Sequence, residues 1–329
     1  MMSGKMPILT IHHKTEYRYA HPVAFGEHTI MLRPRQGHDL RILAHRLTID
    51  PEPMRLRWIH DVFGNSVAIA TFDERADTLT FTSTATVEYD PAEEFALTPD
   101  DPAFFYPFLY DDEEYPDLVQ FVTPQYGDPN GELSAWARQF LDAEAPTPTF
   151  KILSGMTHGI RRAFSYRKRH EQGTQHPLDT LQTKSGTCRD FALLMIEALR
   201  RLGIAARFVS GYIFVPGDSA HGYVGGGNTH AWVQVYLPSD GWIEFDPTNG
   251  IIGNRDLVRV AVARDPRQPQ EYAARPGRPH RLGPRDEHPP LSGGIIEVFV
   301  VITVYHIFIG RSDDIHPTCT KRLYQRLAH

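Results

Sequence analysis

Cys188, His230 and Asp246 carry the side chains that nucleophilic thiol chemistry needs, in an order that suits it. A thiolate attacks a carbonyl carbon, an imidazole takes up and returns a proton, and a carboxylate fixes the imidazole tautomer. Cys188 is one of only two cysteines in 329 residues. The three residues therefore predict a Cys-His-Asp site that attacks a carbonyl group through sulfur.

Each of the three residues also has a structural interpretation. A single cysteine is most often a small buried hydrophobic residue, and a single histidine at the start of a strand is usually structural or exposed. Asp246 begins the segment Asp-Pro-Thr-Asn-Gly, in which Asp-Pro and Asn-Gly both favour turns. The three residues together, in compatible positions, favour the catalytic interpretation.

The element that must position Cys188 is an amphipathic helix predicted over residues 188–202. A small, Gly-containing segment precedes it, and Gly203 ends it. Aligned peptide dipoles and free N–H groups at a helix start favour an anion, so this position favours the reactive thiolate. The polar neighbours of Cys188 argue against burial in an apolar core.

The elements that must position His230 and Asp246 are two apolar strands. His230 begins one strand, Asp246 lies in the next strand 16 residues later, and Pro238–Gly241 form the turn between them. An antiparallel hairpin of this length brings a residue near the start of one strand beside one near the end of the other. We therefore predict that this hairpin and a strand over 205–215 form an antiparallel sheet covered by the Cys188 helix.

The remaining sequence predicts an α+β protein with four parts. Residues 7–90 contain short alternating strands typical of a β-sandwich. Residues 91–149 form an acidic and aromatic connector with a helix, and residues 150–262 hold the catalytic core. Residues 263–329 are atypical, since a Pro-, Arg- and His-rich linker precedes the apolar stretch 295–309, which predicts one or two strands.

Composition limits the classes of function. The chain is 41% hydrophobic and 22% charged, as soluble globular proteins are, and a net charge of -6 gives no general argument for nucleic-acid binding. Its two cysteines, Cys188 and Cys319, do not make a disulfide framework. No apolar stretch has the length of a signal peptide or a membrane span. We expect a cytoplasmic protein without nucleic-acid or membrane partners, whose oligomeric state is open and includes a dimer.

Several separated segments resemble the bacterial transglutaminase-like group of the papain-like superfamily. Residues 7–90 also resemble the β domain that often precedes this core in bacteria, so the resemblance spans roughly residues 7–262. The segments that carry the core resemblance are Phe164-Ser-Tyr166, Thr180-Leu181, Gly186-Thr-Cys188-Arg-Asp190-Phe, Gly211-Tyr212, Asn228-Thr-His230-Ala-Trp232 and Trp242-Ile-Glu-Phe-Asp246-Pro-Thr.

The resemblance implies that Cys188 is the nucleophile, His230 the general base and acid, and Asp246 the residue that orients it. It implies a thioester acyl-enzyme, formed from an amide of a peptide or protein and released to water or an amine. The backbone N–H of Cys188 suits an oxyanion hole, and Tyr166 is the candidate for a second donor. Trp232 and Tyr212 are candidates for lining the acyl site, with core packing as the alternative for all three aromatic residues.

The leading hypothesis is a transglutaminase-like thiol hydrolase or acyltransferase, with hydrolysis favoured over transamidation because no cross-linking target is evident. Without a calcium-loop pattern such as D-x-D-x-D-G, we expect no metal and no cofactor. Three alternatives remain: a protein-glutamine transglutaminase, a binding module with a relic triad, and a zinc hydrolase. The last would use His158, His170, His176 or His221, which lack a ligand pair at helical i, i+4 spacing.

Overall fold

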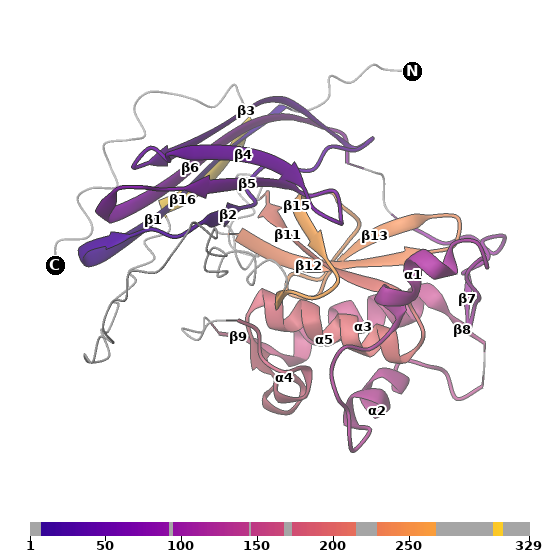
Figure 1. Cartoon of the computed structure of the whole chain (residues 1–329). Coiled ribbons are helices and arrows are strands. Elements are labelled where there is room, and N and C mark those ends of the chain that lie inside the picture. Colours follow the sequence, from indigo (N-terminus) through magenta and orange to yellow (C-terminus); the bar gives the residue numbers. More distant parts are fainter. Residues whose placement is uncertain are drawn as a thin grey trace, which may run out of the picture.

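The computed structural model describes residues 8–91, 95–144, 146–167, 173–214, 229–267 and 305–311. It shows an N-terminal β domain next to a core in which helices cover a second sheet (Figure 1). Most strands pair antiparallel, which confirms the predicted α+β class.

The N-terminal domain consists of two sheets that share a hydrophobic cluster. Its long strands alternate between buried and exposed side chains, as expected where one face of a sheet is covered. In β1, for example, Leu9 and Ile11 are buried, whereas His12 is exposed. One sheet has the order β16-β1-β6-β3 and the other β2-β5-β4. The strands are β1 (Ile8–Ala24), β2 (His28–Ile30), β3 (Leu40–Asp50), β4 (Arg55–His60), β5 (Ser66–Thr71), β6 (Arg75–Tyr89) and β16 (Tyr305–Arg311).

Strand β16 comes from the C-terminal part of the chain and pairs antiparallel with β1. It overlaps the end of the apolar stretch predicted to form strands. The predicted linker over 268–290, the first part of the apolar stretch and Cys319 lie outside the described residues.

The core contains a five-stranded antiparallel sheet of order β14-β13-β12-β11-β15. Its strands are β11 (Ala206–Ile213), β12 (Thr229–Leu237), β13 (Gly241–Asp246), β14 (Ile251–Ile252) and β15 (Leu257–Ala263). The helices are α1 (Tyr115–Val122), α2 (Glu132–Arg138), α3 (Thr149–Ala163), α4 (Pro177–Thr183) and α5 (Cys188–Arg201). Two short strand pairs complete the core: β7 (Phe105–Tyr106) with β8 (Thr147–Pro148), and β9 (Ser165–Tyr166) with β10 (Ser185–Gly186).

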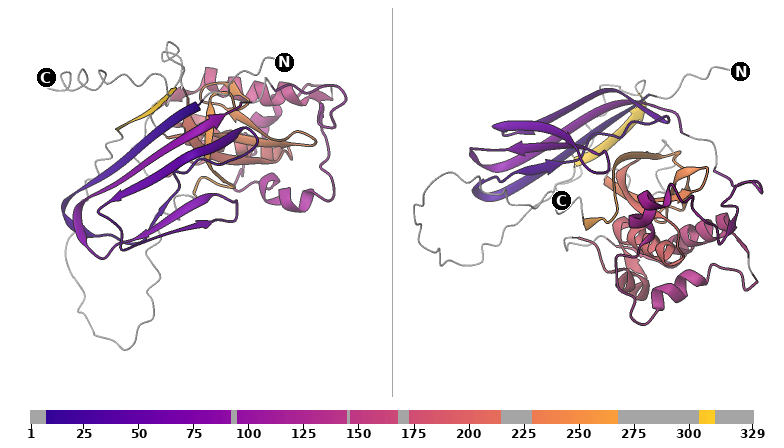
Figure 2. Two further views of the ribbon diagram at one scale, coloured as in Figure 1. Left: turned by 90° about the horizontal axis from the view of Figure 1, so that it is seen from above. Right: turned by 45° about the vertical axis from the view of Figure 1, so that its right-hand side comes forward.

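Both faces of the core sheet are covered, as the right-hand view of Figure 2 shows. Helix α5 packs on one face against alternate residues of β12, among them Ala231 and Val233. The N-terminal domain packs on the other face, where Phe63 packs against the cluster that contains Val209 and Trp232. Leu9 and Val87 of the N-terminal domain share a further cluster with Tyr212 of β11. Because neither face meets water, β12 is buried along nearly its whole length instead of alternating.

Polar contacts hold the two domains together. Arg259 of β15 forms ion pairs with Asp39 of the N-terminal domain and with Glu244 of β13. The side chain of Asn65 donates to the carbonyl oxygen of Val262 (2.7 Å) and accepts from its N–H (2.9 Å). The backbone N–H of Arg35 donates to the carbonyl oxygen of Arg259 (2.8 Å). The N-terminal domain is therefore attached directly to edge strand β15 of the core sheet.

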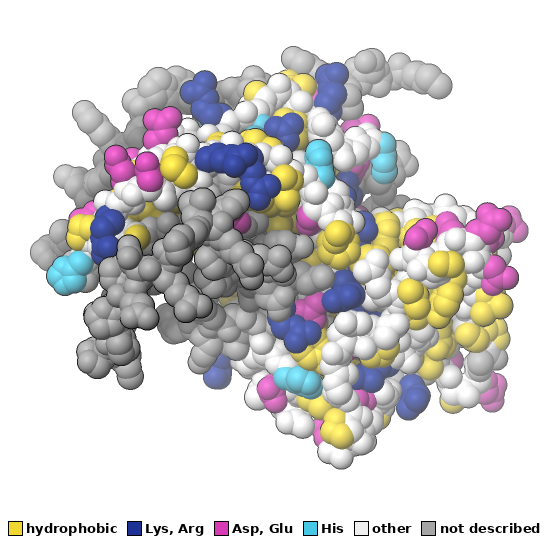
Figure 3. Space-filling view, viewed as in Figure 1, with side chains coloured by type: hydrophobic (Ala, Val, Ile, Leu, Met, Phe, Trp, Pro, Cys, Tyr) yellow, Lys and Arg dark blue, Asp and Glu magenta, His cyan; other side chains and the backbone are white. Residues whose placement is uncertain are grey.

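The segment between the domains is acidic and aromatic at its surface. Figure 3 shows apolar and acidic side chains side by side over the region of α1 and β7. Phe95, Tyr106 and Phe108 pack against the hydrophobic core, while Leu109 stays exposed. This segment thus covers the core with part of its aromatic residues.

Candidate active site

Helix α5 fixes Cys188 at its first position. Asp190, fully buried, accepts hydrogen bonds from the backbone N–H (2.8 Å) and the hydroxyl (2.9 Å) of Thr187, the residue before the helix. Its other oxygen accepts from the backbone N–H of Gln175 (2.7 Å). Cys188 is 7% exposed and belongs to the hydrophobic cluster of the core, so the prediction that its polar neighbours would keep it out of an apolar core is wrong: the helix buries the thiol although Thr187 and Arg189 are polar. Asp190 therefore fixes the helix start, and with it the position of the thiol.

His230 and Asp246 lie at the ends of neighbouring strands β12 and β13. These strands pair through Val233 and Phe245, so Asp246 and His230 are diagonal neighbours on the sheet. Their side chains are in contact: Nε2 of His230 lies 2.7 Å from Oδ2 of Asp246, and both side chains are fully buried. The structure brings together the two residues that the sequence predicts as a pair.

Electrostatics couples this pair to Cys188. Burial lowers the pKa of His230, but Asp246 and the nearby Cys188 outweigh that effect and raise it to about 10. Burial raises the pKa of Asp246, but His230 and two donors of the following turn lower it below its ordinary value. Asp246 and Asn249 both approach Nε2 of His230, so the side-chain hydrogen bond with Cys188 that helps to raise this pKa falls to the other ring nitrogen, Nδ1. This nitrogen is therefore the one left for proton exchange with the sulfur.

The three aromatic candidates have different surroundings. Tyr166 ends β9 and pairs with Gly186, two residues before Cys188; burial and the charge of Cys188 raise its pKa to about 12. The ring of Trp232 stacks on His230 with centroids 6.0 Å apart. Tyr212 belongs to the hydrophobic cluster that the two domains share. Tyr166 and Trp232 thus lie beside Cys188 and His230, whereas Tyr212 takes the core-packing role that the sequence also allows.

Asn249 lies beside the His230–Asp246 pair, although the sequence analysis did not identify it as a site residue. Its side-chain Nδ2 lies 2.8 Å from Oδ2 of Asp246 and 3.3 Å from Nε2 of His230. From the sequence alone, Asn249 is interpreted only as part of the turn-favouring segment Asp-Pro-Thr-Asn-Gly. The signal that could have found it is the tendency of Asp to bond donors two and three residues ahead, which predicts that Asp246 and Asn249 share one turn.

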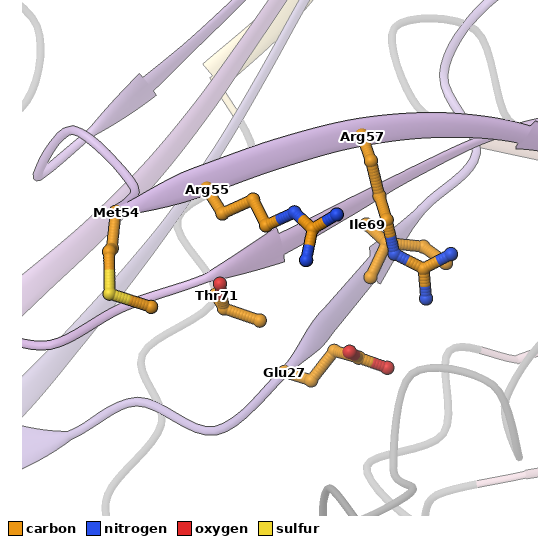
Figure 4. Close-up of a pocket in the computed structure, with 6 residues that line it drawn as sticks. All are labelled: Glu27, Met54, Arg55, Arg57, Ile69 and Thr71. Carbon is orange, nitrogen blue, oxygen red and sulfur yellow. The ribbon is translucent and has the colours of Figure 1, made fainter.

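Other candidate sites are not at the triad. A cavity of about 370 Å³ lies in the N-terminal domain and is lined by Glu27, Met54, Arg55, Arg57, Ile69 and Thr71 (Figure 4). Among the described residues, no three His, Cys, Asp or Glu side chains gather in a way that could hold a metal ion; His170 and His221 are not described. Every described helix falls short of what a membrane span requires in length and apolar character.

Comparison with known proteins gives the same two regions. The family described as "Bacterial transglutaminase-like N-terminal region" matches residues 9–88, and the "Transglutaminase-like superfamily" matches residues 135–247. An uncharacterized protein of Mycobacterium tuberculosis is 30% identical over 276 residues, covering 77% of this chain and 82% of the relative. A protein-glutamine gamma-glutamyltransferase of Pseudomonas aeruginosa is 39% identical over 75 residues, 22% of this chain and 11% of the relative.

A solved structure shares the fold over most of this chain. It comes from Cytophaga hutchinsonii, is described as a "Putative Cysteine Protease", and is 22% identical with a TM-score of 0.59, covering 82% of this chain and 85% of the other. The family matches and the mycobacterial relative confirm the resemblance seen in the sequence. This chain belongs to the bacterial transglutaminase-like family, with both its N-terminal region and its core.

Proposed function

We propose that the protein is a cysteine enzyme that acts on amide bonds of peptides or proteins through a thioester on Cys188. The observation that carries the proposal is the buried His230–Asp246 pair, 2.7 Å apart and electrostatically coupled to a cysteine at a helix start. A buried imidazolium next to sulfur stabilises a thiolate, and few structural roles require this combination.

The residues have distinct roles in the proposed reaction. The Cys188 thiolate attacks the amide carbon, and the oxyanion that forms accepts hydrogen bonds from the backbone N–H of Cys188 and from the hydroxyl of Tyr166. The His230 imidazolium then gives its proton to the leaving nitrogen as the C–N bond breaks, leaving a thioester. In the second half, His230 takes a proton from the acceptor that attacks the thioester, and the thiolate returns.

The acceptor decides between two reactions. We propose water, and hence hydrolysis, because transfer to an amine requires a bound amine that keeps water away from the thioester. Transamidation is the second candidate, and the similarity of 75 residues to a protein-glutamine gamma-glutamyltransferase favours it. Both reactions pass through the same thioester.

Mass spectrometry distinguishes these reactions. Glutamine-containing peptides would be incubated with the wild-type protein and with Cys188→Ala, with and without an added primary amine. Hydrolysis of a glutamine side chain makes the peptide about one dalton heavier, amine transfer adds the amine with loss of ammonia, and proteolysis cuts the chain. All products should be absent with Cys188→Ala. Products that persist in this variant would overturn the proposal.

A further inference from the structure

We propose that Asn249 is a positioning residue of the active site, whose side-chain amide holds the Asp246 carboxylate where it can direct His230. The inference rests on the proposed function, since it concerns the pair that supports Cys188. It adds a fourth side chain to the three that the sequence identifies.

Two side-chain groups approach the same carboxylate oxygen of Asp246. Oδ2 of Asp246 is 2.7 Å from Nε2 of His230 and 2.8 Å from Nδ2 of Asn249. The other oxygen, Oδ1, accepts from the backbone N–H groups of Thr248 (2.9 Å) and Asn249 (3.3 Å). Donors from the turn thus contact both oxygens of Asp246, which fixes the rotation of the carboxylate as well as its position.

Burial makes these donors necessary. Asp246 is 0%, His230 1% and Asn249 8% exposed, so bulk water has almost no access to the carboxylate. A buried carboxylate that lacks donors takes up a proton or turns toward other partners. Asn249 donates a hydrogen bond without bringing a charge, so Asp246 stays ionised and the attraction between Asp246 and His230 is kept.

Helix α3 holds the turn that carries Asn249. Nη1 of Arg161 donates to the carbonyl oxygen of Thr248 (3.1 Å), and the backbone N–H of Gly250 donates to the carbonyl oxygen of Asp246 (2.8 Å). Gly250 has φ of +71°, and a Cβ placed there would lie 2.8 Å from Cδ of Arg161 and 3.2 Å from Cδ2 of His158. The turn therefore packs tightly on α3, and Asn249 has little freedom to move away from Asp246.

The test follows the pH dependence of Cys188 alkylation by iodoacetamide, measured by intact mass. The titratable and charged groups that face this site are His158 and Arg161 on α3, Cys188 on α5, and His230 on β12. Asn249→Ala should lower the neutral-pH rate about tenfold, because a hydrogen bond to a charged group is lost. It should also move the acid limb to higher pH, because Asp246 without this donor protonates more readily.

Two further variants of Asn249 test whether its side-chain amide is responsible for the effect. Asn249→Asp keeps the shape but sets two carboxylates side by side, which share a proton, so its acid limb should move further. Asn249→Gln keeps the amide and should recover part of the wild-type rate. Asn254→Ala is the matched control, since Asn254 is also buried and bonds a buried carboxylate, Asp39, at the domain contact. It should lower stability and leave the pH profile unchanged.

Proton NMR separates this inference from the proposed function. The downfield N–H signal of the His230–Asp246 bond should be lost at a higher pH in Asn249→Ala than in the wild type as the pH is lowered. If Cys188 of the wild type reacts no faster than a free thiol but this difference is seen, the proposed function fails and the role of Asn249 stands. If Asn249→Ala and Asn249→Asp are folded and keep both the wild-type NMR midpoint and alkylation profile, Asn249 is not a positioning residue.

Discussion

The His230 side chain carries a positive charge at neutral pH because of two neighbouring groups. Burial alone would lower the pKa of His230, but Asp246 and Cys188 raise it to about 10. The imidazolium is therefore present at neutral pH and is lost as the pH rises through about 10. The same shift adds folding stability that is fully present below the unfolded value of about 6.5 and disappears as the pH rises through about 10.

We expect Cys188 to react with iodoacetamide at pH 6 well above the rate of a free thiol, because the imidazolium stabilises the thiolate. His230→Ala should reduce the rate to that of a free thiol. His45→Ala is the control, since His45 bonds Ser83 within the N-terminal domain. A wild-type rate no higher than that of a small thiol would exclude an activated nucleophile and favour the binding-module alternative.

At the residue scale, the sequence reveals those site residues that can be recognised from their chemical type alone. Cys188, His230 and Asp246 have reactive or ionisable side chains and lie in elements that the sequence predicts. Their proximity could therefore be predicted. Asn249 could not, because its role depends on the conformation of one turn and on the burial of Asp246. The direction of Tyr212 depends on a domain contact, which a local pattern does not reveal.

At the scale of elements, the close approach of β11 and β15 depends on one glycine. Gly211 pairs with His230 on one side and Arg259 on the other, at an irregularity in the pairing with β15. A Cβ at this position would lie 2.1 Å from the carbonyl oxygen of Val258, which is backbone and cannot rotate away. The absence of a side chain at Gly211 thus allows β15 to pair with β11, the strand that also pairs with β12 at His230.

Gly211→Ala should therefore lower the free energy of unfolding by about 2 kcal/mol or more, because one strand must shift. Urea denaturation measures the change. Gly127→Ala is the control, since a Cβ at Gly127 meets nothing within 4 Å. Equal stability of the two variants would show that the pairing of β11 and β15 adapts without cost.

Long or strongly patterned elements could be predicted at this scale, whereas the short helices α1 and α4 could not. The helix predicted over 188–202 is α5, and the predicted hairpin consists of β12 and β13. Helices α1 and α4 have only eight and seven residues. Helices this short gain their stability mainly from tertiary packing, such as that of Leu118 and Phe121 of α1. Their local sequence carries too weak a signal.

At the scale of the whole molecule, ion pairs connect the N-terminal domain to the sheet that carries His230 and Asp246. Asp39 contacts Arg259, and Arg259 contacts Glu244, which lies two residues before Asp246 on β13. Asp39 and Arg259 are 220 residues apart in the sequence, so no local pattern could predict their pairing. Removal of Asp39 takes away one of the two carboxylates that compensate the buried Arg259 charge, and also leaves the buried amide of Asn254 without its acceptor.

Asp39→Ala should accordingly lower the free energy of unfolding by about 3–5 kcal/mol in urea denaturation. Glu88→Ala is the control, because Glu88 pairs with Arg41, whose side chain is 68% exposed. That exposed pair should contribute no more than about 1 kcal/mol. A similar loss in both variants would contradict the structural role of the domain contact.

The side chain of Asn65 bonds both polar backbone groups of Val262 on edge strand β15. An uncovered strand edge is a template on which other chains can assemble into aggregates. Synthesis proceeds from the N-terminus and domains tend to fold in that order. The loop that carries Asn65 is therefore made before β15. The group that covers this strand edge is already present when β15 leaves the ribosome, which limits the time during which the edge could pair with another chain.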